Sequence, residues 1–341
     1  MKILVIKRDK IGDLLLTTPM LAHLRRSMPD AKVHVLANDY NAWVLDGNDD
    51  VDRVWVYRRV RAGSQINIGA AIGIVWQNVQ LRREHFDVAI VANGSESPRA
   101  IARGVSVGAR RVIAYADDCR RHPGLSDCLS IPSRSHESDR LLAMLAPLGI
   151  AAPAEAIDPG YALPAAQHAF ALEWLAAHGL APGSYIVLGL GARRAKKQPT
   201  REQILAWSAY WKRTWNLSTV FMWTPGKSDN PQYPGDDDVA QPVLDANQPH
   251  ILPFRGALAP ALGLIWNART SVFPDSGLMH FAAASPGGVL GLFAETDISP
   301  HPDQWGPRGR RAAFLEARAS VAELGDEAVM RALAPLAGVA R

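Results

Sequence analysis

The sequence predicts an α/β protein made of two units, each a parallel sheet flanked by helices. Short apolar runs typical of buried strands alternate with stretches of helical spacing, and parallel strands need such long crossover connections. A Pro-, Ala- and Gly-rich stretch over 151–165 interrupts the alternation, and the 341 residues exceed the usual size of one core. We therefore expect domains over 1–160 and 161–341, joined by a hinge and facing a cleft, with the last helix a candidate for packing back on the first domain.

The strands of the first half are expected where branched apolar residues cluster. The run over 3–6 comes first, followed by runs over 33–37, 54–57, 88–92 and 112–115, with helical stretches between several of them. Thr17, Thr18 and Pro19 predict a helix start, because hydroxyl side chains cap helices and proline suits the first helical position. The apolar spacing over 139–148 predicts a helix that closes this unit.

The second half repeats the pattern after the Pro-rich stretch. Helices are expected over 167–178 and 201–215, and strands over 185–190, 220–223, 271–274 and 289–293. The two halves share no internal sequence repeat. The second unit is therefore predicted from its own alternation of strands and helices.

The composition is that of an ordinary globular enzyme, with 48% hydrophobic and 21% charged residues. The two cysteines, Cys119 and Cys128, are too few for a disulfide framework and lie in no metal-binding cluster, which favours a reducing compartment. The chain enters a strand directly, without a signal peptide, and no apolar run reaches about 18 residues. We therefore expect a cytoplasmic protein.

Positive charge gathers in the first half of the chain, although the formal net charge is only +4. Arginine pairs include Arg82 with Arg83 and Arg110 with Arg111. Such residues either form solvated faces or contact an anionic acceptor or anionic lipid headgroups. Nucleic acid is a poorer match as a partner, because the sequence shows no basic run interleaved with aromatic residues and no known nucleic-acid-binding module.

Four stretches fall at predicted strand ends, where open α/β sheets bind their ligands. The first, KIGDLLLTTP, places Gly12 and Asp13 between a strand and a helix, although Asp13 could instead be a structural turn or cap residue. The second, GLGARRAKKQPT, places Lys196 and Lys197 just ahead of a helix, and lysine is suited to binding phosphate. This stretch lacks the spacing of a P-loop, so an ATPase is not supported.

The third stretch, FPDSGLMHFAAA, predicts an anion site. Asp275 and Ser276 follow a strand, Gly277 permits a tight turn, and a helix beginning near Leu278 presents free N–H groups that suit a phosphate. The alternatives are that Asp275 and Ser276 are ordinary helix caps and that His280 faces the core. The fourth stretch, LFAETDISPHPDQWGP, forms a loop after the last expected strand.

Three segments together resemble the lipopolysaccharide heptosyltransferases, glycosyltransferase family 9. The run PALGLIWNARTSVFPDSGLMHFAAASPGGVLGLFAETD, closed by WGP, resembles the family signature. IGDLLLTTPMLAHLRRSMPDAKVHVLA resembles the family's opening, and HFDVAIVANGS resembles its middle. The resemblance covers nearly the whole chain and implies a GT-B fold, in which two Rossmann-like domains face each other across a central cleft.

The resemblance implies an inverting, metal-independent glycosyltransferase that moves a heptose from ADP-heptose to an acceptor hydroxyl in lipopolysaccharide inner-core synthesis, with no cofactor besides this donor. Asp13 matches the family's general base, and near a helix start it should stay ionised and weakly basic. Lys196 matches the lysine that stands three residues before a proline, here Pro199, and contacts the donor phosphates. The segment D-[ST]-G-x-x-H that cradles the diphosphate is matched by Asp275, Ser276, Gly277, Leu278, Met279 and His280.

Two departures from the family pattern keep other functions open. The family often has tryptophan where Gln198 stands, and its acidic nucleotide contact after the strand near 223 has no clear counterpart, so Asp229 is the candidate. Thr224 and Gly12 complete the expected donor contacts. The alternatives are a related glycosyltransferase with a different donor or acceptor, such as a protein or small metabolite, and a non-catalytic sugar-nucleotide-binding protein.

The expected acceptor is an anionic glycolipid, because the resemblance implies Kdo-lipid A or the inner core. Arg58, Arg59 and Arg61 in VYRRVRAGS follow the third expected strand, and we expect them to bind this acceptor. The same reasoning implies peripheral contact with the inner-membrane surface.

Overall fold

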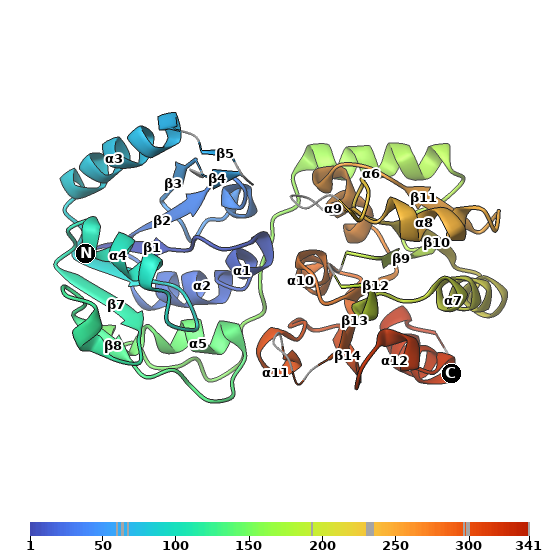
Figure 1. Cartoon of the computed structure of the whole chain (residues 1–341). Helices are drawn as coiled ribbons and strands as arrows, with labels where there is room; N and C mark the ends of the chain where they lie inside the picture. The colour runs from blue at the N-terminus through green and yellow to red at the C-terminus, as the bar shows by residue number, and fades with distance from the viewer. Residues whose placement is uncertain are drawn as a thin grey trace. The chain divides into compact units, whose positions relative to one another are not determined.

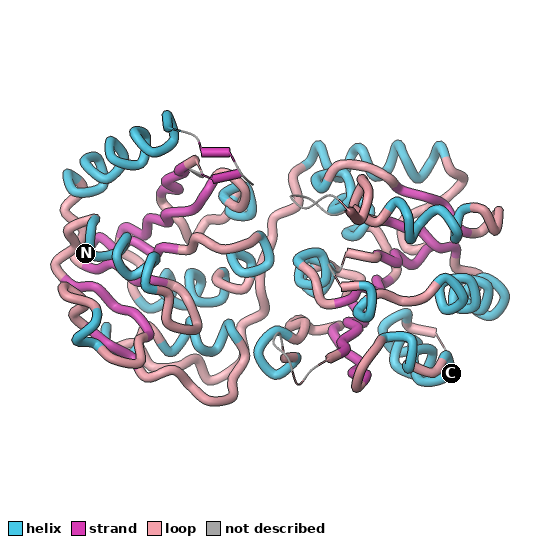
Figure 2. The backbone as a smooth tube through the Cα atoms, in the orientation of Figure 1, coloured by secondary structure: helices cyan, strands magenta, loops and turns pink. Residues whose placement is uncertain are grey.

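The computed structural model describes the chain except residues 59–60, 63–64, 67, 192–193, 230–234, 296, 298–300 and 340–341. The chain divides into two compact units, Met1–Ala162 and Leu163–Arg341. Figure 1 colours the first unit from blue to green and the second from green to red, and Figure 2 shows the strands of each unit gathered into a sheet among helices.

The N-terminal unit contains a six-stranded parallel sheet in the order β3-β2-β1-β6-β7-β8. Burial of β1, β2 and β6 on both faces explains their continuous apolar runs. A separate antiparallel pair joins β4 (Arg61–Ala62) to β5 (Gln65–Ile66). The strands of the main sheet are β1 (Lys2–Ile6), β2 (Lys32–Asn38), β3 (Arg53–Tyr57), β6 (Val88–Val91), β7 (Arg111–Tyr115) and β8 (Asp127–Leu129).

Helices connect these strands and cover the sheet. Leu4 and Ile6 of β1 share a core cluster with Leu81 and Ile101, which come from helices α3 and α4. Helices α2 and α5 pack against each other. The helices are α1 (Ile11–Leu15), α2 (Thr18–Ser27), α3 (Ile68–Arg83), α4 (Pro98–Ser106) and α5 (Glu137–Ala143), with short 3₁₀ turns η1 (Ala42–Leu45), η2 (Cys119–Arg121) and η3 (Ala146–Leu148).

The C-terminal unit repeats this plan with a parallel sheet in the order β11-β10-β9-β12-β13-β14. Numbered within its own unit, each six-stranded sheet has the order 3-2-1-4-5-6 of a dinucleotide-binding fold. The strands are β9 (Tyr185–Gly189), β10 (Ser218–Met222), β11 (Ile251–Phe254), β12 (Thr270–Pro274), β13 (Val289–Ala294) and β14 (Ala312–Ala317).

The helices of the C-terminal unit form two groups. Helices α7, α8 and α12 share one core cluster, in which Trp207 and Trp211 are fully buried, whereas α9 packs on α6 and α10. The last helix therefore packs within its own unit against α7 and β14. The helices are α6 (Ala165–Ala177), α7 (Arg201–Trp215), α8 (Asp237–Leu244), α9 (Leu258–Trp266), α10 (Gly277–Ala284), α11 (Pro302–Trp305) and α12 (Asp326–Ala337), with 3₁₀ turns η4 (Ala195–Lys197) and η5 (Val321–Glu323).

Helix α7 shows how local sequence sets an element. The Thr200 hydroxyl accepts a hydrogen bond from the Gln203 backbone N–H, and the Gln203 side chain accepts one from the Thr200 N–H. This reciprocal cap fixes the start of the helix. Asn216, at φ 53°, ends it in the left-handed conformation that asparagine tolerates. The expected range of 201–215 is confirmed.

The expected helix start at Thr17 is confirmed, because α2 begins at Thr18 with Thr17 as its N-cap residue and Pro19 in its first turn. The expected hydroxyl cap is wrong, and a shorter helix precedes this start. Helix α1 begins at Ile11, and Thr17 makes no side-chain cap for α2. Instead the Thr17 and Thr18 hydroxyls donate to the backbone oxygens of Asp13 and Leu15, each at 2.8 Å. Asp13 consequently lies inside the first turn of a helix rather than in a loop.

Cys119 and Cys128 form a disulfide, with Cα atoms 5.8 Å apart. The sequence analysis found two cysteines too few for a disulfide framework and did not expect this pair. The turn after β7 returns the chain to β8 and brings the two side chains together. Within the described ranges, no helix combines the length and apolar character needed to cross a bilayer.

Candidate active site

Each sheet has a switch point where connections leave in opposite directions, between β1 and β6 in one unit and between β9 and β12 in the other. In open parallel sheets, ligands bind outside the carboxyl ends of the strands at this point. Lys7 follows β1 and Asn93 follows β6, whereas Asp275 follows β12. The predicted site residues Asp13, Lys196 and Asp275 therefore come from segments that leave these strand ends.

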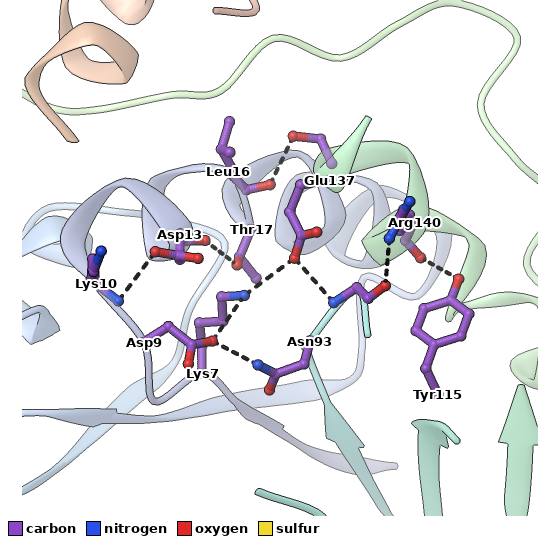
Figure 3. Close-up of polar contacts among 12 residues, drawn as sticks. Lys7, Asp9, Lys10, Asp13, Leu16, Thr17, Asn93, Tyr115, Glu137 and Arg140 are labelled. Atoms are coloured by element: carbon purple, nitrogen blue, oxygen red, sulfur yellow. Dashed lines mark hydrogen bonds and ion pairs between the residues drawn. The ribbon is translucent and has the colours of Figure 1, made fainter. Parts of the chain in front are cut away.

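Lys7 is the centre of a charged cluster in the N-terminal unit. Its side chain is 1% exposed, and its Nζ lies 3.3 Å from Asp9 Oδ2 and 3.5 Å from Glu137 Oε1. Figure 3 shows the ammonium pointing between these carboxylates, with Asp13 nearby on α1. The sequence analysis missed Lys7 and Glu137, because a lysine and a glutamate that are far apart in the chain carry no spacing signal.

The surrounding backbone holds this cluster in place. Gly94 N–H donates to Glu137 Oε1 at 3.0 Å, and the Arg140 guanidinium donates to the Gly94 carbonyl, also at 3.0 Å (Figure 3). The Asn93 amide donates to Asp9 Oδ2 at 2.7 Å. A side chain at Gly94 would collide with the Glu137 carboxylate, so glycine is required for this close approach.

Asp13 lies in the first turn of α1. Its carboxylate accepts a hydrogen bond from the Lys10 N–H at 3.2 Å, so Asp13 also serves as a local cap. Ser138 donates its hydroxyl to the Leu16 carbonyl at 3.0 Å and thereby ties α1 to the start of α5 (Figure 3). Gly12 is buried beside Asp13 in the same turn.

Burial raises the pKa of the Asp13 carboxyl above its ordinary value, with Lys7 opposing the rise and the charges of Asp9 and Glu137 adding to it. This direction is opposite to the one that the helix start favours, because desolvation of the carboxylate outweighs the effects that stabilise the anion. Burial lowers the pKa of Lys7, but the carboxylates of Asp13, Glu137 and Asp9 outweigh burial and leave it raised. Lys7 thus stays charged among the acids.

In the C-terminal unit, Lys197 and Lys196 have different surroundings. Lys197 is buried, and its Nζ donates to Asp275 Oδ2 at 3.0 Å, with side chains 5% and 14% exposed. Lys196 is 65% exposed, and its Nζ lies 3.5 Å from Glu295 Oε1. Arg194, about half exposed, lies 3.5 Å from the other oxygen of Glu295. The exposed pair of cations can reach a ligand, whereas Lys197 fixes Asp275.

The segment after β12 forms the start of α10, as predicted. Ser276 is the N-cap residue, and its side chain accepts a hydrogen bond from the Met279 N–H at 3.4 Å. Gly277 and Leu278 open the helix and are partly exposed, whereas Met279 and His280 are buried. The cap interpretation of Ser276 is confirmed.

The start of α8, which follows the connection from β10, contains acidic residues that the sequence analysis did not select. Asp236 is buried, its carboxylate accepts from Gln198 Nε2 at 2.7 Å, and burial raises its pKa. Thr224 is exposed, but its backbone N–H donates to Asp236 Oδ2 at 3.3 Å. Asp229 is exposed on the same connection. The three aspartates that open α8 are the signal that could have identified Asp236.

Asp237 is also held tightly at the start of α8. It accepts from Trp223 Nε1 at 2.8 Å and from two nitrogens of Arg255, each at 2.9 Å. These bonds, Arg255 first, hold the pKa of Asp237 well below its usual range. Gln198, which stands where the family often has tryptophan, forms a polar pair with Asp236.

Two of the three expected acceptor residues, Arg58 and Arg61, are among the described residues. Arg58 is exposed directly after β3. Arg59 lies outside the described residues, and Arg61 lies in the short strand β4.

Comparison with known proteins supports the sequence resemblance. The model of glycosyltransferase family 9 (heptosyltransferase) matches residues 76–330. A solved structure of a family 9 glycosyltransferase from Veillonella parvula DSM 2008 has 18% identity and a TM-score of 0.82, over 98% of this chain and 97% of its own. No curated protein sequence matches the chain.

Two Escherichia coli structures are also similar. The ADP-heptose lps heptosyltransferase II has 18% identity and a TM-score of 0.75, over 99% of this chain and 98% of its own. The heptosyltransferase WaaC with ADP has 16% identity and a TM-score of 0.74, over 98% of this chain and 100% of its own. These likenesses show a shared fold.

Proposed function

Because the family model matches residues 76–330, the chain belongs to glycosyltransferase family 9, and from this premise we propose that it moves a heptose from ADP-heptose to an acceptor hydroxyl with inversion. The chain is a glycosyltransferase with a GT-B fold of two Rossmann-like units. The proposed setting is lipopolysaccharide inner-core synthesis. One E. coli neighbour is named for ADP-heptose and the other is a structure with ADP, and both names support this donor.

Asp13 carries the proposal. A general base works best when its pKa approaches the working pH, and burial raises the pKa of Asp13 in that direction. In the proposed reaction Asp13 takes the proton of the acceptor hydroxyl, and the acceptor oxygen forms a bond to the anomeric carbon. The bond from that carbon to the ADP oxygen breaks, and its electrons leave with ADP.

The departing ADP gains negative charge, which the C-terminal unit is suited to stabilise. The exposed ammonium of Lys196 and the guanidinium of Arg194 both form ion pairs with Glu295. The first turn of α10 presents backbone N–H groups. Lys197 holds Asp275 at the edge of this turn. We propose that these groups neutralise the diphosphate, so that the reaction proceeds without a metal ion.

Nucleotide binding and turnover test this proposal. Thermal unfolding is measured with ADP, UDP, GDP and CMP, because a ligand that binds the folded form raises the apparent stability. We expect ADP to give the largest shift, and turnover with ADP-heptose and Kdo-lipid A to follow. A larger shift with UDP would contradict the donor. Binding of ADP-heptose without transfer to any acceptor would favour the non-catalytic alternative.

Helix α3 supports peripheral contact with a membrane. Its inner face packs on the unit through Ile74 and Leu81, whereas its outer face leaves Ile72, Val75, Trp76 and Val79 exposed, from 37% to 66%. Residues at this spacing form one stripe along a helix. A stripe of large apolar side chains that includes tryptophan is suited to the interfacial region of a bilayer.

Basic residues at the end of α3 identify the surface that it would meet. Arg82 and Arg83 are exposed in the last turn, and Arg58 is exposed on the connection before the helix. This combination of apolar and cationic side chains complements anionic lipids. We propose that α3 lies on the cytoplasmic surface of the inner membrane, where a glycolipid acceptor is accessible.

Vesicle flotation tests the role of α3. We expect Ile72→Ser combined with Trp76→Ser to weaken binding to vesicles containing phosphatidylglycerol, while the melting temperature is unchanged because both side chains are exposed. Leu172→Ser, at a similarly exposed apolar residue of α6, is the matched control. Equal flotation of the double variant, the control and the unmodified protein would contradict this contact.

A further inference from the structure

We propose that a pocket lined by Arg8, Arg99 and Arg103 in the N-terminal unit binds an anionic group of the acceptor, a sugar carboxylate or a phosphate. The pocket has a volume of about 270 Å³, and Tyr57 and Ile74 complete much of its wall. This inference rests on the proposed function, because it assumes that the N-terminal unit holds the acceptor. It adds a binding site that the expected residues Arg58, Arg59 and Arg61 do not include.

The guanidinium groups of Arg8 and Arg103 are held in position by contacts within the protein. Arg8 Nε donates to the Tyr57 hydroxyl at 3.0 Å, and Arg8 Nη1 donates to the Arg99 carbonyl at 3.0 Å. Arg103 Nη2 donates to Gln77 Oε1 at 3.1 Å. The guanidinium carbons of Arg8 and Arg103 lie 5.7 and 6.0 Å from the centre of the Tyr57 ring. Such ordering lowers the cost of binding.

These arginines carry positive charge that neighbouring acids do not neutralise. Among the described residues, no carboxylate forms an ion pair with Arg8, Arg99 or Arg103. Burial lowers the pKa of Arg103, and the charge of Arg8 lowers it further. An anion between the two guanidinium groups would relieve both effects. Arginine is also the side chain whose planar fork matches carboxylate and phosphate oxygens.

The position of the pocket connects it to the candidate base. Arg8 stands between Lys7 and Asp9 on the connection that leaves β1, and Tyr57 ends β3. Both residues therefore lie at the carboxyl edge of the sheet, and Arg8 is on the connection that leads into Asp13. An acceptor anchored here by its negative group presents its remaining hydroxyls toward this edge. The volume accommodates a charged group and part of the ring that carries it, which favours an acidic sugar over a whole nucleotide.

Ligand binding without turnover tests the pocket directly. Titrations with free Kdo, an acidic sugar, and with inorganic phosphate are followed for the full-length protein, Arg103→Gln and Arg8→Gln. We expect Kdo binding to weaken at least about tenfold in both variants, the loss typical of a charged hydrogen bond. Arg110→Gln is the matched control, because Arg110 is 82% exposed and paired with Asp87. Melting temperatures and ADP affinity verify that the variants fold.

Kinetics then identify the source of the anion. With saturating ADP-heptose, we expect the acceptor KM to rise about tenfold in Arg103→Gln and to recover partly in Arg103→Lys, with kcat nearly unchanged. Competition between free Kdo and the acceptor supports the assignment. Binding of phosphate without competition against the acceptor would overturn it, as would unaltered Kdo affinity in both variants. If no transfer is detected but Kdo binding still depends on Arg103, the proposed function fails while the pocket stands.

Discussion

The two units place charged clusters at equivalent ends of equivalent sheets, but the balance of charge differs. In the N-terminal unit, the ammonium of Lys7 interacts with three carboxylates, those of Asp9, Asp13 and Glu137. The cluster is largely buried, with Lys7 1% and Glu137 3% exposed. Burial, with the added charges of Asp9 and Glu137, raises the pKa of Asp13 and suits the uptake of a proton.

The C-terminal unit has the opposite excess. Glu295 contacts two cations, Lys196 and Arg194, and Asp275 contacts Lys197. The Lys196 side chain is 65% exposed. Exposed cations beside a helix start suit a diphosphate that arrives and leaves. The same sheet topology is therefore suited to proton uptake in one unit and to diphosphate binding in the other. The strand order determines where the site lies, and the balance of charge at the strand ends determines which chemistry the site favours.

The largest effect that follows from this comparison is on turnover. Asp13→Asn removes the proton acceptor but keeps the shape of the side chain, so we expect kcat to fall by about 10²- to 10⁴-fold. Steady-state transfer from ADP-heptose measures this loss, and Asp49→Asn, at an exposed residue of the same unit, is the control. Retention of more than a small fraction of kcat would show that the carboxylate is not the base.

Stability should distinguish the two lysines that lie against acids. Lys7→Met removes the buried ammonium that lies 3.5 Å from the buried Glu137 carboxylate, and we expect a loss of about 3–5 kcal/mol in the free energy of unfolding. Lys197→Met should cost less, because its partner Asp275 is more exposed. Lys2→Met, which breaks a partly exposed pair with Glu84, should cost about 0–1 kcal/mol. Urea denaturation compares the three, and equal losses would contradict the difference in burial.

The pH dependence of kcat/KM should report the raised pKa of Asp13. The base must be ionised, so activity should fall as the pH drops through this pKa, by about tenfold per pH unit below it. The midpoint should lie above about 3.9, the ordinary value for aspartate. A midpoint at or below the ordinary value would show that the burial of Asp13 does not influence catalysis.

The smallest effect is expected at Lys196. Lys196→Ala removes one exposed cation, and we expect ADP affinity to fall about tenfold, as for the loss of a hydrogen bond to a charged group. Its pair with Glu295 is exposed, so the free energy of unfolding should change by about 1 kcal/mol or less. Calorimetric titration with ADP measures the change, and Lys212→Ala on α7 is the control. Unchanged affinity in both variants would remove Lys196 from the donor site.

The sequence predicted the elements that have a strong local signal. The buried strands and the self-capped helix α7 were found because apolar runs and caps are local. Five strands were missed. The two-residue strands β4 and β5 are too short to carry a pattern, β8 has three half-buried residues, β11 contains Pro253, and β14 has only one buried residue. The disulfide was missed because pairing depends on the turn that joins β7 to β8.

The sequence predicted the site residues that follow strands, but not those that meet only through the fold. Asp13 and Asp275 were selected because they follow strands, and both lie at the sheet edges. Spacing could not show which of Lys196 and Lys197 turns inward, since neighbouring residues differ only in their contacts. Glu137 reaches Lys7 through the fold alone. Its role in raising the pKa of Asp13 therefore required the structure.

The division of labour between the units is tested most directly by titrating ADP into Asp13→Asn protein. If the N-terminal carboxylate moves the proton while the C-terminal cations hold the nucleotide, the dissociation constant should stay within about twofold of that of the unmodified protein, although turnover is lost. A dissociation constant that rises in proportion to the loss of turnover would contradict this account.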